Sequence, residues 1–165
     1  MNTNDQNHKD SPVGRAGVSD INEIHPIELG RQLKKPTGEI GLVVAGNMNI
    51  ANEQIYDFVL SQINIGDNFK ILEIGCGNGK FISKFFSSNS NIHLTVIDYS
   101  DVMCSETKAL NKEFINENKL VVQCEDAIDM SLSDEFFDMV VTINNETYFT
   151  LFWTRNFVSR YHSGG

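Results

Sequence analysis

The chain contains 165 residues, of which 41% are hydrophobic and 21% are charged. This length and composition are typical of a single globular domain and exclude a fibrous or wholly disordered chain. Acidic side chains outnumber basic ones by 22 to 13, which gives a formal net charge of -9. That charge disfavours nucleic acid or an anionic membrane surface as a partner.

The spacing of cysteine and histidine excludes two further classes. The three cysteines lack CxxC spacing and the histidines lack the spacing of metal ligands, so we expect no zinc framework, no disulfide scaffold and no bound metal. No apolar run is long enough to cross a bilayer, and the N-terminal residues contain no secretory signal. Reduced thiols and these absences together lead us to expect a cytoplasmic protein without membrane contact.

The first 65 residues divide into a tail and a helical region. Residues 1–20 are rich in Asn, Asp, Ser and Gly and have little to bury, so we expect a disordered tail. The pattern of residues 21–65 predicts an N-terminal helical cap, with a short helix around Ile27–Leu33. Pro36 interrupts this pattern, and a second helix is predicted to begin near Thr37. Apolar residues three and four apart predict helix over roughly Ala51–Gln62.

From residue 66 onward, short apolar runs alternate with helical patterns. Branched and aromatic residues predict four strands, Phe69–Ile74, Ile92–Asp98, Lys119–Cys124 and Phe136–Ile143. Between the first three runs, apolar spacing predicts helices over about 81–86 and 102–114. This alternation predicts an α/β domain over residues 66–165, with a Rossmann-like parallel sheet covered by helices on both faces. Aromatic residues three to four apart over 149–157 predict a further packed helix.

A glycine-rich turn follows the first predicted strand, in the sequence Ile71-Leu-Glu-Ile-Gly-Cys-Gly-Asn-Gly79. Glycine lets the backbone turn tightly and approach a ligand, and the N–H groups at the start of the following helix point toward it. A dinucleotide fingerprint would require another glycine at position 80, where this chain has Lys80. An NAD(P)-binding oxidoreductase domain is therefore the weaker alternative.

Three carboxylates accompany this turn. Glu73, two residues before the first glycine, favours a cationic or amine-bearing ligand. Asp98 ends the second predicted strand, where a carboxylate can accept hydrogen bonds from both hydroxyls of a ribose. Asp126 follows the third predicted strand, where it could accept from the exocyclic amine of an adenine or simply cap the next turn.

These segments together resemble a known family. The stretches Glu73-Ile-Gly-Cys-Gly-Asn-Gly79, Val96-Ile-Asp98-Tyr-Ser100, Glu125-Asp126-Ala127 and Phe137-Asp-Met-Val-Val141 occur in order over roughly residues 66–150. They resemble the successive motifs of class I S-adenosylmethionine-dependent methyltransferases. The resemblance implies S-adenosylmethionine as the cofactor, an unidentified small molecule as the methyl acceptor, and a sheet with strand order 3-2-1-4.

The resemblance also implies roles for individual residues. Gly75, Gly77 and Gly79 would pass under the methionine and ribose, with Cys76 in the same turn, and Glu73 would lie near the amino end of the cofactor. Asp98 would bind the ribose, Tyr99 and Met103 would flank the adenine, and Asp126 with Ala127 would contact its edge. Asn144 would lie beside the transferred methyl. For Met103 a position in the core is an equal alternative. No catalytic residue is implied.

The C-terminal residues depart from the family pattern. The family sheet has seven strands, and we see no resemblance in the segment after about residue 150 beyond its two last glycines. The predicted strand Phe136–Ile143 would then be an apolar edge unless the tail, the N-terminal helices, a second copy or a partner protein covers it. We therefore expect a truncated methyltransferase of doubtful activity. A non-catalytic, partner-dependent cofactor-binding module is the alternative.

Overall fold

The computed structural model describes residues 20–132, 137–145 and 149–157, with the backbone alone from residue 144 onward. The predicted N-terminal tail lies almost wholly outside these residues. Five strands form one sheet in the order β3-β2-β1-β4-β5. Their bounds are Lys70–Ile74 for β1, His93–Asp98 for β2, Leu120–Cys124 for β3, Phe137–Asn145 for β4 and Phe149–Phe157 for β5.

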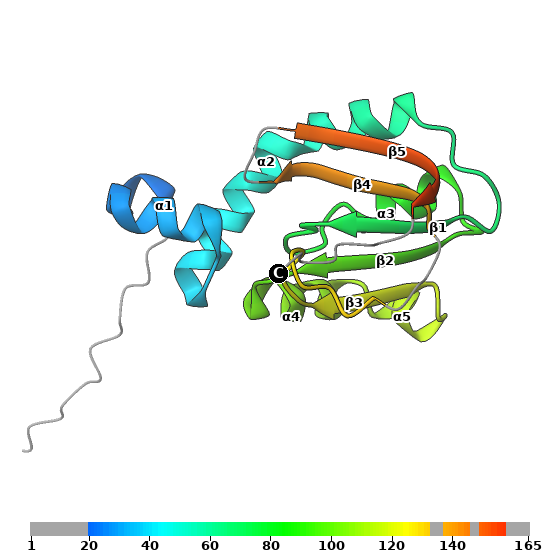
Figure 1. Cartoon of the computed structure of the whole chain (residues 1–165). Coiled ribbons are helices and arrows are strands. Elements are labelled where there is room, and N and C mark those ends of the chain that lie inside the picture. Colours follow the sequence, from blue (N-terminus) through cyan, green and yellow to red (C-terminus); the bar gives the residue numbers. More distant parts are fainter. Residues whose placement is uncertain (1–19, 133–136, 146–148, 158–165) are drawn as a thin grey trace, which may run out of the picture.

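The first four strands are parallel and have the expected order. β1 lies in the centre, where Ile71 pairs with Leu94 of β2 on one side and with Met139 of β4 on the other. β3 pairs with β2 at the edge of the sheet. The arrowheads of β1, β2 and β4 point toward the same side, where α1 lies (Figure 1). The glycine turn that follows β1 and Asp98 at the end of β2 therefore lie at the same end of the sheet.

Helices α2 to α5 pack on one face of this sheet. α3 (Ile82–Ser88) follows the glycine turn, while α4 (Asp101–Leu110) and α5 (Lys112–Asn116) connect β2 to β3. The largest core cluster joins buried side chains of α2 and α3 to those of β1, β2 and β4 that point to this face, including Val59, Phe85, Ile71 and Val141. The predicted helix over 102–114 is divided in two at Asn111.

The other face of the sheet has a different cover. Leu72 and Ile97 are buried there together with Phe137, and Met130 and Leu132 of the segment after β3 pack against them. The prediction of helices on both faces is therefore wrong for the described residues. Leu72, Ile97 and Phe137 form an apolar cluster on this face, and the described segment that covers them is a connection with turns rather than a helix.

Two helices precede the sheet. α1 comprises Pro26–Lys34 and α2 comprises Gly38–Gln62, after a short 3-10 turn at Ile21–Glu23. α2 is one helix of 25 residues, so the separate helix expected at 51–62 is its C-terminal half. Figure 1 shows α2 running from beside α1 to the face of the sheet near β4 and β5. The division of the chain into a cap and a sheet domain stays a prediction.

The segment 149–157 was predicted to be a helix, and this prediction is wrong. It forms β5, which runs antiparallel to β4, with Val140 opposite Trp153 and Thr142 opposite Leu151. The aromatic spacing fitted a helix, but the segment is also rich in aromatic and β-branched residues, which favour strands. The unpaired backbone along β4 decides between the two because β5 satisfies its hydrogen bonds. Of the covers expected for the edge of β4, the C-terminal segment is the one that the structure shows.

Within the described ranges, no helix combines the length and apolar character needed to cross a membrane.

Candidate functional site

The glycine turn lies between β1 and α3 and contains three residues with left-handed backbone. Gly75, Gly77 and Gly79 have φ angles of 79°, 57° and 70°, values that glycine adopts at little cost. The N–H of Gly75 donates to the carbonyl of Ile97 at 2.7 Å, which attaches the turn to the end of β2. The predicted turn is thus present, and it is joined to the neighbouring strand.

Asp98 ends β2 and faces this turn. Its Oδ2 accepts a hydrogen bond from the N–H of Gly77 at 2.9 Å, and its Oδ1 accepts one from the N–H of Ser100, also at 2.9 Å. The residue is 8% exposed. Burial raises the pKa of this carboxyl above its usual 3.8, and the backbone N–H groups of Ser100, Gly77 and Tyr99 oppose the rise. The structure therefore brings Asp98 and the glycine turn into direct contact, as the sequence suggested.

Helix α4 holds the glycine turn from the other side. Thr107 Oγ1 donates to the carbonyl of Gly77 at 2.9 Å, and Asn111 Nδ2 donates to the carbonyl of Gly79 at 3.0 Å. Both side chains are buried. Sequence analysis missed them, although two polar residues four positions apart on the buried side of a predicted helix were a signal that they bond to something inside the protein.

Glu73 lies beneath the turn, in the sheet, and is 1% exposed. Tyr56 of α2 donates its hydroxyl proton to Oε1 of Glu73 at 2.7 Å. Burial raises the pKa of Glu73 from its usual 4.5 to about 7; the hydrogen bond from Tyr56 opposes this rise, and the nearby Asp98 adds to it. The proximity of Glu73 to a cofactor stays a prediction, but its partner in the protein is now identified.

Tyr99 and Ser100 attach the N-terminal helices to the end of β2. The Tyr99 hydroxyl donates to the carbonyl of Lys34, and Lys35 Nζ lies 5.1 Å from the centre of the Tyr99 ring. Ser100 donates its hydroxyl to the carbonyl of Pro36 and accepts a hydrogen bond from the N–H of Met103 at 3.3 Å. The loop between α1 and α2 therefore lies beside Asp98, where it borders the candidate site.

The remaining predicted residues lie in different environments. Met103 and Cys76 are 1% and 6% exposed, so both are part of the interior. Asp126 and Ala127 begin the segment after β3; the preceding Glu125 donates its N–H to the carbonyl of Asp98 at 3.0 Å.

The carboxylate of Asp126 caps a turn, because its Oδ1 accepts from the N–H of Ile128 at 3.0 Å. This is the structural role weighed against adenine recognition, and recognition stays a prediction. Asn144 lies in β4, but its side chain is outside the described residues. No group of three or more potential metal ligands occurs in the described part of the chain.

Comparison with known proteins finds a matching family. The sequence profile of a family described as "Methyltransferase domain" matches residues 71–163. A malonyl-[acyl-carrier protein] O-methyltransferase of Bacillus cytotoxicus is 32% identical over 79 residues, which make up 48% of this chain and 25% of that protein. The chain thus spans about a quarter of the curated relative that it matches.

A solved structure shows a related fold at low identity. A chain in the complex between the Haloferax volcanii Trm112 methyltransferase activator and a putative methyltransferase superposes with a TM-score of 0.51 at 16% identity. The match covers 59% of this chain and 42% of that one. A methyltransferase of Geobacter sulfurreducens, solved with S-adenosyl-L-homocysteine, has a TM-score of 0.46 at 17% identity, covering 54% of this chain and 35% of its own.

Proposed function

We propose, from the premise that this chain belongs to the methyltransferase domain family, that it binds S-adenosylmethionine where β1 and β2 end. We further propose that it takes part in methyl transfer to a small-molecule acceptor. The observation that carries the proposal is the contact between the carboxylate of Asp98 and the N–H of Gly77. It places a hydrogen-bond acceptor suited to ribose hydroxyls against a glycine turn that a ligand can approach closely.

The residues where β1 and β2 end fit an adenosine carrying a positively charged sulfur. A Cβ built on Gly77 would meet nothing within 4 Å, so the backbone there faces open space. The two oxygens of Asp98 accept hydrogen bonds from the N–H groups of Gly77 and Ser100, which fixes the carboxylate at the turn where a ribose would approach. Asp98 and Glu73 also place negative charge near a cationic ligand whenever they are ionised.

The chemistry requires orientation rather than a set of catalytic side chains. When bound, S-adenosylmethionine supplies a methyl group already activated by the sulfonium, so alignment of the acceptor provides much of the rate. In this chain the α4 residues Thr107 and Asn111 fix the turn, and Asp98 would hold the ribose. The loop at Pro36, bonded to Ser100, borders the same edge and would limit access of water.

Calorimetric titration with S-adenosylmethionine and with its demethylated product tests the proposal. We expect saturable binding to the wild-type chain, and a loss of about 1–3 kcal/mol in Asp98→Ala, the scale of hydrogen bonds to a charged acceptor. Asp98→Asn is the conservative variant, because its one amide oxygen can keep the Gly77 hydrogen bond while the amide nitrogen replaces the oxygen that accepts from Ser100. Circular dichroism of both variants separates a loss of binding from a loss of folding.

Other outcomes would change the assignment. Wild-type affinity in a folded Asp98→Ala chain would remove Asp98 from the site. Saturable binding of NADH without binding of S-adenosylmethionine would favour the oxidoreductase alternative. Tight cofactor binding without methyl transfer to any tested acceptor would favour a non-catalytic module.

A further inference from the structure

The outer edge of β3, on the side away from β2, exposes hydrogen-bonding backbone in the described part of the sheet. In the described sheet, β3 pairs with β2 and with no second strand. The Lys119 carbonyl accepts from the N–H of Leu94, and the N–H of Glu125 donates to the carbonyl of Asp98. In a parallel ladder alternate residues bond to the neighbouring strand. Leu120, Val122 and Cys124 therefore direct their N–H and C=O groups away from β2.

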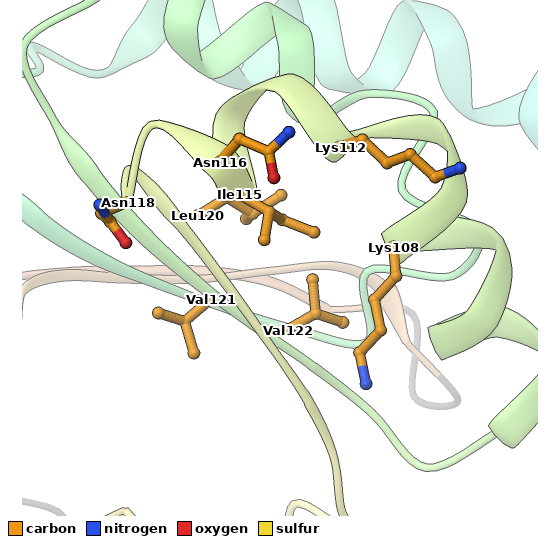
Figure 2. Close-up of a pocket in the computed structure, with 8 residues that line it drawn as sticks. All are labelled: Lys108, Lys112, Ile115, Asn116, Asn118, Leu120, Val121 and Val122. Atoms are coloured by element: carbon orange, nitrogen blue, oxygen red, sulfur yellow. The ribbon is translucent and has the colours of Figure 1, made fainter.

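A groove runs along this edge. It has a volume of about 520 Å³ and lies between β3 and the end of α4 with α5 (Figure 2). Ile115 of α5 and Leu120 and Val122 of β3 form an apolar floor. Val121, which is 51% exposed, lines the groove from the next position of the strand. The groove thus combines a row of backbone donors and acceptors with an apolar surface, the two features that an added strand uses.

The charge of the groove is opposite to that of the whole chain. Two exposed lysines, Lys108 and Lys112, lie together at one end of it, and none of its 8 lining residues is acidic. Within the described residues neither lysine forms a salt bridge, whereas Lys84 and Lys119 are each paired with a carboxylate. In a chain with net charge -9 this local cationic end is suited to an acidic partner.

We propose that this groove binds an extended acidic segment of another protein, which adds a strand to the free edge of β3. The segment pairs its backbone with Leu120, Val122 and Cys124. It places an apolar side chain on the floor at Ile115 and an acidic side chain beside Lys108 and Lys112. Residues two apart in a strand lie on one face. We therefore expect the apolar residue and the acidic residues of the bound segment to be separated from one another by one residue each.

Fluorescence anisotropy with a labelled peptide of sequence Thr-Val-Thr-Glu-Thr-Glu-Thr tests this inference. We expect saturable binding to the full chain that weakens as salt is raised. The double variant Lys108→Gln, Lys112→Gln should bind roughly tenfold more weakly, on the scale of two exposed ion pairs. Lys70→Gln, which removes an exposed lysine at the start of β1, is the matched control and should bind as the wild type does.

Two altered peptides complete the experiment. A peptide with lysine in place of both glutamates should not bind, and one with N-methyl groups at alternate residues should lose affinity because it lacks strand donors. Equal binding of the N-methylated peptide, unchanged binding to the double lysine variant, or no binding to the wild-type chain would each overturn the proposal. Self-association in sedimentation velocity that disappears in the lysine variant would assign the groove to a second copy and also overturn it.

Discussion

The buried pair formed by Glu73 and Tyr56 connects the glycine turn to the N-terminal helices. Tyr56 lies on α2, and its hydroxyl reaches a carboxylate of β1 that is 1% exposed. A carboxylate in such a place is costly to ionise, which is why the pKa of Glu73 rises from 4.5 to about 7. A single proton near neutral pH therefore changes the charge at the centre of the sheet.

This pair makes folding stability depend on pH. The folded chain holds the Glu73 proton up to about pH 7, whereas the unfolded chain releases it near 4.5. The folded state thus binds more protons between these values, and the free energy of unfolding falls as pH rises through this window. The contribution of Glu73 to this loss is roughly 3 kcal/mol.

Glu73→Gln tests the pH dependence because the amide is nearly isosteric and its oxygen can accept from Tyr56. In urea denaturation at pH 5 and pH 8, we expect the variant to lose less stability than the wild type between the two values. Asp98 also has a raised pKa, so the comparison is between the two proteins at each pH rather than between pH values alone. Parallel stability curves would show that Glu73 does not titrate in this window.

Individual site residues differ in how far the sequence revealed them. The glycines and Asp98 could be predicted because each occurs at the end of a strand with an apolar pattern, in a fixed relation to that strand. Tyr56 could not, because its partner lies in another element and the helix pattern of 51–62 gives no sign of the contact. Contacts between distant segments depend on how helices dock, which the pattern of one segment does not contain.

At the scale of elements, the glycine turn is held between β2 and α4. Asp98 accepts from one side of the turn, and the buried side chains of Thr107 and Asn111 donate from the other. Asn111 also bonds to the carbonyl of Thr107 at 3.0 Å, at the point where α4 ends. The break between α4 and α5 thus occurs at a residue that fixes the turn, a contact that apolar spacing over 102–114 could not indicate.

Gly77 and Gly79 form a matched pair that tests this arrangement. Both have left-handed φ angles, but a Cβ at Gly79 would lie 2.7 Å from Thr107 Cγ2, whereas one at Gly77 would meet nothing within 4 Å. We expect Gly77→Ala to cost about 1–2 kcal/mol from backbone strain alone, and Gly79→Ala roughly 2–5 kcal/mol because overpacking adds to that strain. Chemical denaturation measures both values.

The same two variants separate stability from binding. The methyl group of Gly77→Ala would enter the open space in which we place the ligand, so this variant should lose cofactor affinity while it remains folded. Equal losses of stability in the two variants would show that the side chains of α4 do not pack closely against the turn at Gly79.

The strands themselves show where a sequence pattern is sufficient. The bounds of β1 to β4 were anticipated to within two residues because each apolar run is flanked by turn residues or polar breaks. β5 was not, because its aromatic residues fit either a helix or a strand, and the deciding factor is the free edge of β4. The free edge of β4 exists only once the sheet has assembled, so the sequence of the segment 149–157 alone does not reveal it.

At the scale of the whole molecule, the two faces of the sheet are covered by different kinds of structure. Helices α2 to α5 pack on one face, and the described part of the other is covered by the connection that contains Met130 and Leu132. The interior on the helical side includes Cys76, and Cys104 of α4 is also buried, at 3% exposed. Cys124 at the end of β3 is exposed.

Thiol reactivity therefore reports on the packing of the glycine turn and α4 against the sheet. In the native protein we expect one thiol to react rapidly with Ellman's reagent at pH 8, with the other two on the order of a hundredfold slower because they require opening of the structure. In denaturant all three should react. Cys124→Ser is the control, which should leave no rapid phase; three rapid thiols in the native wild type would contradict the packing of α3 and α4.

The two hydrogen bonds of the Ser100 hydroxyl limit which side chains can replace it. Its hydroxyl donates to the carbonyl of Pro36 and accepts the N–H of Met103 in a site that is 0% exposed. Alanine would lose both bonds, and aspartate lacks the hydroxyl proton. Threonine is the one common replacement that keeps a donor and an acceptor on a single small atom. One hydroxyl group thus joins the loop after α1 to the first turn of α4.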